Sequence, residues 1–197
     1  MRNTGKEAVM SNRYELRLAG EGGQGLILAG LILAEAAVVY DGKFACQTQS
    51  YGPEARGGAS MSEVIIDTEE IDYPQVIAAD ALLAMSQEAC DKYTSDLKKG
   101  GVLIVDSVYV KRVPLASSPY RVPITKIAEE MTGRRITANV VALGLLVGLT
   151  QVVSREALEA AVVARAPKGT TAMNLQALAA GFKMAEQLVR RAYVSGK

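Results

Sequence analysis

The chain has 197 residues, and its 22 basic and 21 acidic side chains leave a formal net charge of +1. It contains no His, no Trp and two Cys. These counts exclude a Ser-His-Asp or Cys-His catalytic site, a His-ligated metal site, and the four thiolates of an iron–sulfur cluster or an all-cysteine zinc site. The nearly balanced charge argues against broad electrostatic binding of nucleic acid or of an anionic membrane.

A hydrophobic fraction of 49% and this length suit one globular domain with a real core. Residues 1–13 are polar, lack an apolar signal segment and are expected to form a flexible tail before a single domain over 14–197. The two cysteines, far apart in apolar stretches, predict reduced thiols and a cytoplasmic protein. The apolar run 140–149 spans about ten residues, whereas a membrane-spanning helix needs about 20.

The first half of the chain predicts three strands and one helix. Residues 14–19 alternate in polarity and precede a Gly-rich turn, which is typical of a strand. Residues 25–40 are apolar on nearly every face, as in a helix buried between a sheet and other helices. After the break at Asp41-Gly42, residues 44–50 and 61–67 predict two further strands. Their connection is too short for a crossover helix, so we expect them to be antiparallel in a mixed sheet.

The second half predicts strand–helix units followed by helices. Residues 81–85, 102–105 and 120–122 are expected to be strands, and Lys99-Gly100-Gly101 to end a helix over 87–98. Ser154 is expected to cap the helix that follows it. The fold class predicted is a three-layer α/β/α domain with a Rossmann-like mixed sheet and a helical C-terminal third, its helices over 124–131, 139–151, 155–165 and 174–192.

The turn Gly20-Glu21-Gly22-Gly23-Gln24-Gly25 lies between the first strand and the first helix and matches G-x-G-x-x-G. Glycines allow positive φ and close approach of a ligand to the backbone, and the N–H groups that open a helix favour an anion. The alternative is a tight turn without ligand. A nicotinamide dinucleotide needs an acidic residue at the end of the second strand. Here that strand ends in Gln49-Ser50, and Asp41 precedes it, so the turn suits a phosphate better than NAD.

A second candidate segment is Ser50 to Ser60, SYGPEARGGAS. Arg56 carries a permanent, forked charge suited to phosphate or carboxylate, although an ion pair with Glu54 in a solvated loop is the alternative. In an α/β sheet this segment and the Gly-rich turn are expected at the same carboxyl edge. The candidate binding residues are Gly22, Gly23, Gln24, Gly25, Ser50, Tyr51, Gly52, Glu54, Arg56, Gly57, Gly58 and Asn139.

Weaker candidates have structural alternatives. Asn139 opens an apolar helix as either a cap or a ligand-contacting amide. Ser86 and Asp106-Ser107 follow strands and either line the same edge or form a helix cap and a turn. Gly144 and Gly148 share a helix face and allow close packing, within the chain or between subunits. No catalytic nucleophile, acid–base pair or metal site emerges from the sequence.

Several of these segments resemble the gamma subunit of 2-oxoacid:ferredoxin (or acceptor) oxidoreductases, closest to the 2-oxoglutarate type. The resemblance runs from about Tyr14 to Ala192, and YGPEARGG after a GGQG turn is its most specific part. The segments that carry it are GEGGQG (20–25), QSYGPEARGGAS (49–60), SEVII (62–66), DYP (72–74), AMSQEA (84–89), LKKGGVLIVD (97–106), NVVALG (139–144) and PKGT (167–170).

This resemblance implies a role in an enzyme that oxidatively decarboxylates a 2-oxoacid, forms an acyl-coenzyme A and passes electrons to ferredoxin or another acceptor. It implies alpha, beta and delta partner subunits that carry thiamine diphosphate, Mg and iron–sulfur clusters, while this chain helps to bind coenzyme A and to assemble the complex. No nucleic acid or membrane is expected as a partner, and self-association of the isolated chain into a homodimer stays open. The alternatives are an indolepyruvate-type subunit and a stand-alone NAD(P)-binding Rossmann-like protein.

Overall fold

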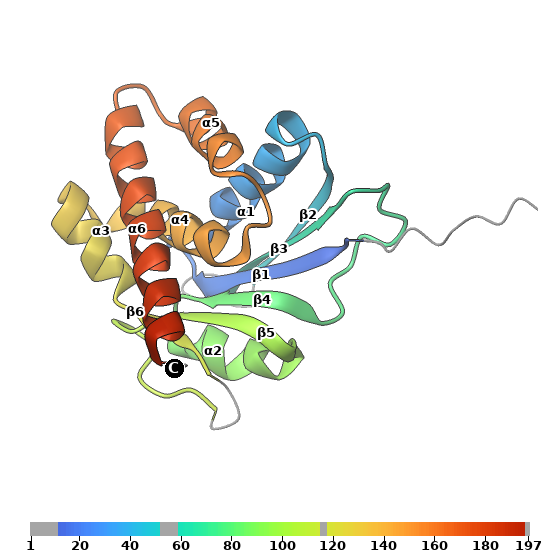
Figure 1. The fold of residues 1–197 in the computed structure, drawn as a ribbon, viewed down its shortest axis with the longest axis horizontal. Helices are drawn as coiled ribbons and strands as arrows, with labels where there is room; N and C mark the ends of the chain where they lie inside the picture. Colours follow the sequence, from blue (N-terminus) through green and yellow to red (C-terminus); the bar gives the residue numbers. More distant parts are fainter. Residues whose placement is uncertain (1–11, 52–58, 115–117, 196–197) are drawn as a thin grey trace, which may run out of the picture.

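The computed structural model describes residues 12–51, 59–114 and 118–195 (Figure 1). Its centre is one six-stranded sheet with the order β2-β3-β1-β4-β5-β6. Strand β3 is antiparallel to both β1 and β2, whereas β1, β4, β5 and β6 are parallel to one another. This arrangement confirms the predicted mixed sheet. The strands are β1 (Tyr14–Glu21), β2 (Phe44–Tyr51), β3 (Ala59–Asp67), β4 (Ala79–Ala84), β5 (Leu97–Asp106) and β6 (Tyr120–Val122).

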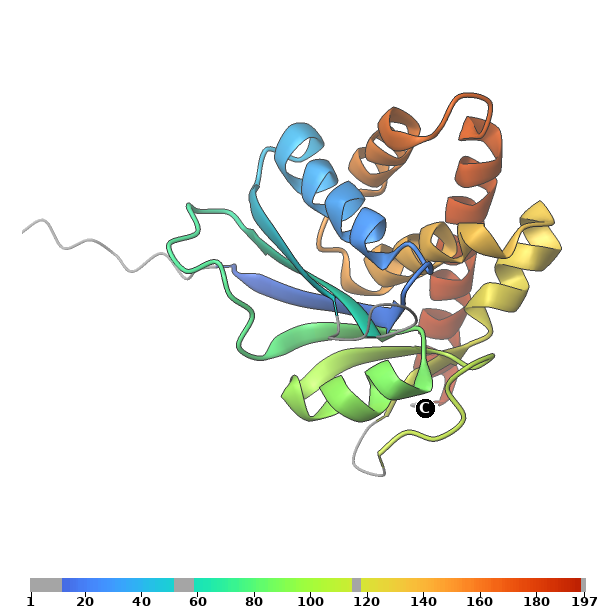
Figure 2. The ribbon, with the colours of Figure 1, turned by 180° about the vertical axis from the view of Figure 1, so that it is seen from behind.

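Helices cover both faces of the sheet, as a three-layer fold requires. Helices α1, α4, α5 and α6 lie on one face, and α2 lies on the other (Figures 1 and 2). The helices are α1 (Leu26–Glu35), α2 (Gln87–Tyr93), α3 (Ile124–Thr132), α4 (Ala138–Thr150), α5 (Arg155–Arg165) and α6 (Thr171–Ser195). Short 3-10 turns at Thr94–Asp96 and Arg135–Thr137 precede β5 and α4.

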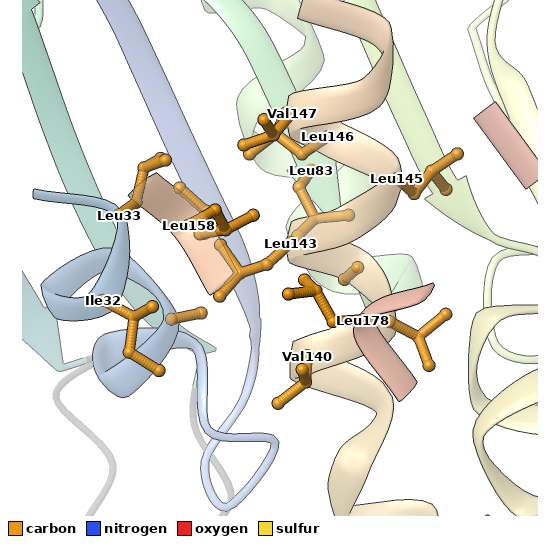
Figure 3. Packing of buried hydrophobic residues seen from close by; sticks show 14 of the residues in the cluster. Ile32, Leu33, Leu83, Val140, Leu143, Leu145, Leu146, Val147, Leu158 and Leu178 are labelled. Carbon is orange, nitrogen blue, oxygen red and sulfur yellow. The ribbon is translucent and has the colours of Figure 1, made fainter. Parts of the chain in front are cut away.

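The two faces of the sheet enclose two hydrophobic cores of different size. Alternate β1 side chains separate them, because Leu16 and Leu18 belong to the larger core and Ala19 to the smaller one under α2. Figure 3 shows the larger core, where Leu33 of α1, Leu143 of α4 and Leu158 of α5 point into a common space. Helix α4 is apolar on all sides, which predicted a buried helix. In the structure it lies between the sheet and α6.

The predicted helix over 87–98 is wrong in extent. Helix α2 ends at Tyr93, and the segment Leu97–Gly101 belongs to β5. Ala79 pairs with Leu97 but Ala81 pairs with Val102, so the lysines and glycines of this segment form a bulge against β4. Gly100 has φ +81° within that bulge, where the sequence pattern indicated a helix end. The sequence pattern of residues 94–101 is compatible with a helix end, but strand pairing with β4 determines the conformation of this segment.

The first predicted helix, over 25–40, is confirmed but changes its winding near its end. Residues Ala36–Tyr40 form a π-helical turn (η1), in which the Asp41 amide donates to the Ala36 carbonyl at 3.0 Å. Asp41 then accepts hydrogen bonds from the amide and the hydroxyl of Ser154, at 2.7 and 2.6 Å. Ser154 in turn accepts from the Ala157 amide, which confirms it as the cap of α5.

Glycines bring α4 and α6 into close contact. A Cβ on Gly144 would lie 2.3 Å from the Leu178 carbonyl oxygen, and one on Gly181 would lie 2.1 Å from the Val141 carbonyl oxygen. A Cβ on Gly148 would likewise meet Ala185 on α6. The glycine spacing on α4 therefore serves packing within the chain, which decides between the two alternatives left open by the sequence.

Candidate ligand-binding site

The Gly-rich turn leaves β1 at its carboxyl end and enters α1 through two residues with positive φ. Gly23 has φ +92°, and Gly25, the residue before α1, has φ +74°. No side chain caps the start of α1, and its first turn holds no acidic residue. The N–H groups of a helix start lack partners within the helix and carry partial positive charge. The turn therefore has the backbone geometry of an anion site.

The Gln24 side chain stabilises this turn through two hydrogen bonds to the backbone. Its amide oxygen accepts from the Glu21 amide at 2.8 Å, and its amide nitrogen donates to the Met85 carbonyl at 3.1 Å. Met85 directly follows β4, so Gln24 ties the ends of β1 and β4 together. A Cβ on Gly20 would lie 2.2 Å from the Gln24 amide oxygen, so a larger residue there would displace the Gln24 side chain from this position. The structure thus gives Gln24 a positioning role.

Asn139 has a similar role from the other side of the turn. Its amide nitrogen donates to the Gly25 carbonyl at 3.2 Å, and its amide oxygen accepts from the Val140 backbone N–H at 2.9 Å. The residue is only 6% exposed. A Cβ on Gly25 would lie 2.6 Å from the Asn139 amide nitrogen. Asn139 therefore fixes the start of α1 relative to the start of α4.

A hollow of about 250 Å³ adjoins the turn at the carboxyl edge of the sheet. It is lined by Gly23, Gln24, Met85, Tyr109, Thr125, Arg135, Ile136 and Ala138. Arg135 supplies its positive charge, and the Arg135 Nε donates to the Glu129 carboxylate at 3.0 Å. The hydrogen bond and charge of Glu129, with a smaller contribution from Tyr109, raise the pKa of the Arg135 guanidinium above its usual value. The hollow therefore combines hydroxyl groups, residues of the Gly-rich turn that leads into α1, and an oriented cation.

Three residues that line the hollow were not predicted from the sequence: Tyr109, Thr125 and Arg135. Tyr109 follows the Asp106-Ser107 turn that the sequence placed at this edge, which was the one signal available. The Asp106 carboxylate is fully buried and accepts from the amide and the hydroxyl of Thr125, at 3.1 and 2.5 Å. It thereby holds the start of α3 against β5. Ser86 caps α2 by accepting from the Ala89 amide. Ser86 and Asp106 therefore have the structural roles that the sequence analysis gave as alternatives, a helix cap and a turn.

The second candidate segment is only partly described. Gly52, Glu54, Arg56, Gly57 and Gly58 lie outside the described residues, and of Tyr51 only the backbone is described.

Its two ends are nevertheless placed. Tyr51 pairs with Ser60, and Ser60 pairs with Gly20, so the backbone on both sides of the segment runs beside the start of the Gly-rich turn. The Ser60 hydroxyl donates to the Glu21 carbonyl at 3.3 Å. Ser50 is exposed on β2. The ends of the segment thus lie at the carboxyl edge of β1 and β2, where the sequence predicted them.

The structure also bears on the nicotinamide alternative. Asp41 precedes β2, and β2 runs parallel to β1 because both are antiparallel to β3. Asp41 therefore lies at the opposite end of the sheet from the Gly-rich turn, where it bonds Ser154. It cannot serve as the acidic ribose partner that a dinucleotide site needs beside this turn.

A second, mostly apolar groove of about 290 Å³ lies between α1, α4, α5 and the start of α6. Ile136, 70% exposed, lines both this groove and the hollow beside the Gly-rich turn. Arg134 lines the groove, whereas its neighbour Arg135 lines the hollow. Two adjacent arginines thus face two different surfaces.

In the described ranges, no group of three or more Cys, Asp or Glu side chains is placed to hold a metal ion. None of the helices described is both long and apolar enough to cross a membrane.

Residues 15–184 match the family model for pyruvate ferredoxin/flavodoxin oxidoreductase. The 2-oxoglutarate synthase subunit KorC of Methanocaldococcus jannaschii is 51% identical over 179 residues, covering 89% of this chain and 96% of the relative. The corresponding subunit of Archaeoglobus fulgidus is 36% identical over 186 residues, covering 94% and 95%.

Two solved structures share the fold. The gamma subunit of a keto/oxoacid ferredoxin oxidoreductase from Geobacter sulfurreducens aligns with a TM-score of 0.82 at 53% identity, covering 89% of this chain and 97% of that one. A 2-oxoglutarate:ferredoxin oxidoreductase from Magnetococcus marinus, with 2-oxoglutarate, coenzyme A and succinyl-CoA bound, aligns with a TM-score of 0.78 at 25% identity. The alignment covers 89% of this chain and 31% of the Magnetococcus chain.

Proposed function

Because the chain belongs to the pyruvate ferredoxin/flavodoxin oxidoreductase family and is a gamma subunit of a 2-oxoglutarate:ferredoxin oxidoreductase, we propose that it binds the phosphate-bearing part of coenzyme A. The site is the Gly-rich turn together with the hollow beside it. The chain provides binding and positioning, and the oxidative decarboxylation itself takes place on partner subunits.

The observation that carries this proposal is the meeting of a helix start and an oriented guanidinium at one edge of the sheet. Coenzyme A carries a pyrophosphate and a 3′-phosphate. Backbone N–H groups at the start of α1 suit one of these groups, and Arg135 suits the other through charge-assisted hydrogen bonds. Gln24 and Asn139 hold the turn in the required shape through backbone contacts.

The segment 50–58 extends the proposed site. Its described end at Ala59 and Ser60 pairs with Glu21 and Gly20, and we propose that Arg56 binds the same ligand. Arg56 would add a second cation, and Tyr51, Gly52, Glu54, Gly57 and Gly58 would shape the loop around it. Contact of this loop with a partner subunit is the competing role, and the variants below distinguish the two.

Thiamine diphosphate, Mg and the iron–sulfur clusters are proposed to reside in the alpha, beta and delta partners. The iron–sulfur clusters do not suit this chain, because its two cysteines cannot supply the thiolates of a cluster and it has no histidine. Thiamine diphosphate supplies the carbanion chemistry of decarboxylation when it is bound in its own subunit. This chain would hold coenzyme A, the acyl acceptor, near the reacting centre.

The test is the variant Arg135→Gln in the assembled complex. We expect the dissociation constant of coenzyme A to rise about tenfold or more, because a charge-assisted hydrogen bond contributes about 1.5–3 kcal/mol. Titration calorimetry with coenzyme A measures this, and the KM for 2-oxoglutarate should not change. Arg134→Gln is the matched control, since it removes the same charge one residue away on the other surface.

An unchanged coenzyme A affinity in Arg135→Gln would exclude this part of the site. The same pair of measurements on Arg56→Ala assigns the second segment. Loss of affinity with assembly intact supports ligand contact, whereas loss of assembly with affinity retained in the residual complex supports partner docking. Size-exclusion chromatography with light scattering reports assembly in both cases.

A further inference from the structure

The two edges of the sheet are built differently. At one edge, β6 has three residues with Arg121 in the middle, and Arg121 donates to the Val110 carbonyl at 2.9 Å. At the other, β2 has eight residues, FACQTQSY, without a charge or a proline. Its register with β3 runs without a bulge from Phe44 to Tyr51. Charges, prolines, bulges and short length are the usual protections of an edge strand, and β2 has none of them.

The sequence of β2 is nearly symmetric about Thr48. Gln47 and Gln49 flank it, followed by Cys46 and Ser50, two side chains of similar size. When a second copy of β2 is placed antiparallel about a two-fold axis at Thr48, Thr48 lies opposite itself, Gln47 opposite Gln49, and Cys46 opposite Ser50. Thr–Thr and amide pairs of this kind stabilise antiparallel strands. Gln47 donates to the Ser62 hydroxyl, and its amide oxygen is left to accept from Gln49.

Helix α1 provides an apolar surface beside the same edge. At 100° per residue, Ile27, Leu31 and Ala34 lie on one side of the helix, which we call the α1 outer stripe. Ala29, Ile32 and Ala36 lie toward α4 and α5 in the larger core, and β2 lies on the side of α1 away from α5 (Figures 1 and 2). Ile27 and Leu31 are half-buried but outside both cores, whereas Ala34 packs against the larger core. In the π-helical turn that follows, Val38 is 47% exposed.

The geometry of the sheet sets the distance between two such stripes. Helix α1 packs mainly on β3, where a Cβ on Gly30 would meet the side chains of Ser62 and Val64. Joining two sheets through β2 would leave three strand spacings of about 4.8 Å between the two copies of β3, so the two α1 axes would lie about 14 Å apart on the same face. Helices in direct contact lie about 8–10 Å apart. The two-fold axis thus pairs the strands, and the two stripes face each other across the joined β2 strands.

We infer that the β2 edge forms an interface between two copies of this chain, which joins their sheets into one continuous sheet of both copies. The occupant is a second copy rather than an unrelated strand, because β2 is complementary to itself about one axis. The contact is isologous and closes as a dimer. It lies beside β2, away from the hollow lined by Arg135.

The test is a disulfide that only this register can form. Ser50→Cys places a thiol opposite the native Cys46 of the second copy, at the Cα separation of about 4.5–5.5 Å that antiparallel pairs share with disulfides. We expect mild oxidation of the full-length variant with copper phenanthroline to give a covalent dimer on non-reducing gels. In the wild-type chain the two Cys46 residues are four positions out of register, about 14 Å apart, and should not link.

The double variant Cys46→Ser/Ser50→Cys is the matched control and should stay unlinked. Thr48→Lys should convert the dimer to a monomer in sedimentation velocity, because two ammonium groups would meet at the axis. Ser118→Lys, which adds the same charge at an exposed position before β6, should leave the dimer intact. A wild-type chain that sediments as a monomer, or a Ser50→Cys chain that gives no covalent dimer, overturns the inference.

The same disulfide should form between gamma subunits in the complex purified with its partners. Its absence there, with the isolated chain linked, would mean that a partner subunit covers the β2 edge and would overturn the interface for the assembled enzyme.

Discussion

Two regions of this molecule depend on glycine for different physical reasons. At the crossing of α4 and α6, Gly144 and Gly181 have ordinary helical backbones, and what matters is the missing side chain, since carbonyl oxygens of the facing helix occupy its place. In the turn between β1 and α1, Gly23 and Gly25 have positive φ, and a Cβ on Gly23 would meet nothing within 4 Å. The first region needs space, and the second needs backbone freedom.

The difference shows why glycine spacing alone is ambiguous. Gly144 and Gly148 are spaced like a contact surface, and Gly20, Gly22 and Gly25 are spaced like a phosphate-binding turn. The structure assigns Gly144 and Gly148 to packing within the chain, because it shows which atoms of α6 a Cβ would meet. It does not in the same way assign a ligand to the Gly-rich turn. We therefore expect substitutions in the two regions to separate folding stability from ligand binding.

The largest effect is expected at the helix crossing. Gly144→Ala and Gly181→Ala should each lower the free energy of unfolding by about 3 kcal/mol or more, because the clash is with backbone rather than with a movable side chain. Urea unfolding measures this loss. Ala180→Gly, on the same helix α6, is the control for helix propensity and should cost about 1 kcal/mol. A loss at Gly144 no larger than that of the control would contradict the close crossing.

An intermediate effect is expected at Gly25, where both reasons apply. Gly25→Ala should cost about 2 kcal/mol, because a non-glycine residue in the left-handed region costs about 1–2 kcal/mol and the new Cβ would displace Asn139. Coenzyme A affinity should fall with it, since Asn139 fixes the start of α1. Asn139→Ala should relieve the clash, so the double variant should be less destabilised than the sum of the two single variants. Strict additivity would argue against the contact.

The smallest stability effect is expected at Gly23. Gly23→Ala faces open space, and its cost of about 1 kcal/mol arises from the positive φ alone. Its effect on coenzyme A should be larger than its effect on folding, because the added methyl group lines the hollow. Calorimetric titration beside urea unfolding compares the two. Unchanged affinity would place the ligand away from Gly23.

Much of the fold followed from local pattern. The alternation in β1, the apolar run of α4 and the Ser154 cap predicted elements that the structure confirms. The short connection after β2 predicted an antiparallel neighbour and hence a mixed sheet. The error at residues 94–101 arose because Lys-Gly-Gly is equally compatible with a helix end and with a bulge, and only pairing with β4 decides between them.

The candidate site divides in the same way. The Gly-rich turn was predictable, because the glycines that allow positive φ and the start of α1 are neighbours in the sequence. Arg135, Tyr109 and Thr125 were not, since they lie on separate elements that meet at the edge of the sheet only after α3 and α4 have packed. Asn139 was predicted as a ligand residue or a cap, and the structure shows its amide holding the Gly25 carbonyl.

The sequence by itself determined the order of most elements, the absence of a catalytic histidine or cysteine cluster, and the resemblance that the family match confirms. These depend on periodicity, composition and short motifs, which are properties of neighbouring residues. Only the tertiary structure decided which glycines make room for a helix, which arginine reaches the hollow, and which strand forms an unprotected edge. These depend on what lies across space from a residue, and packing alone sets that.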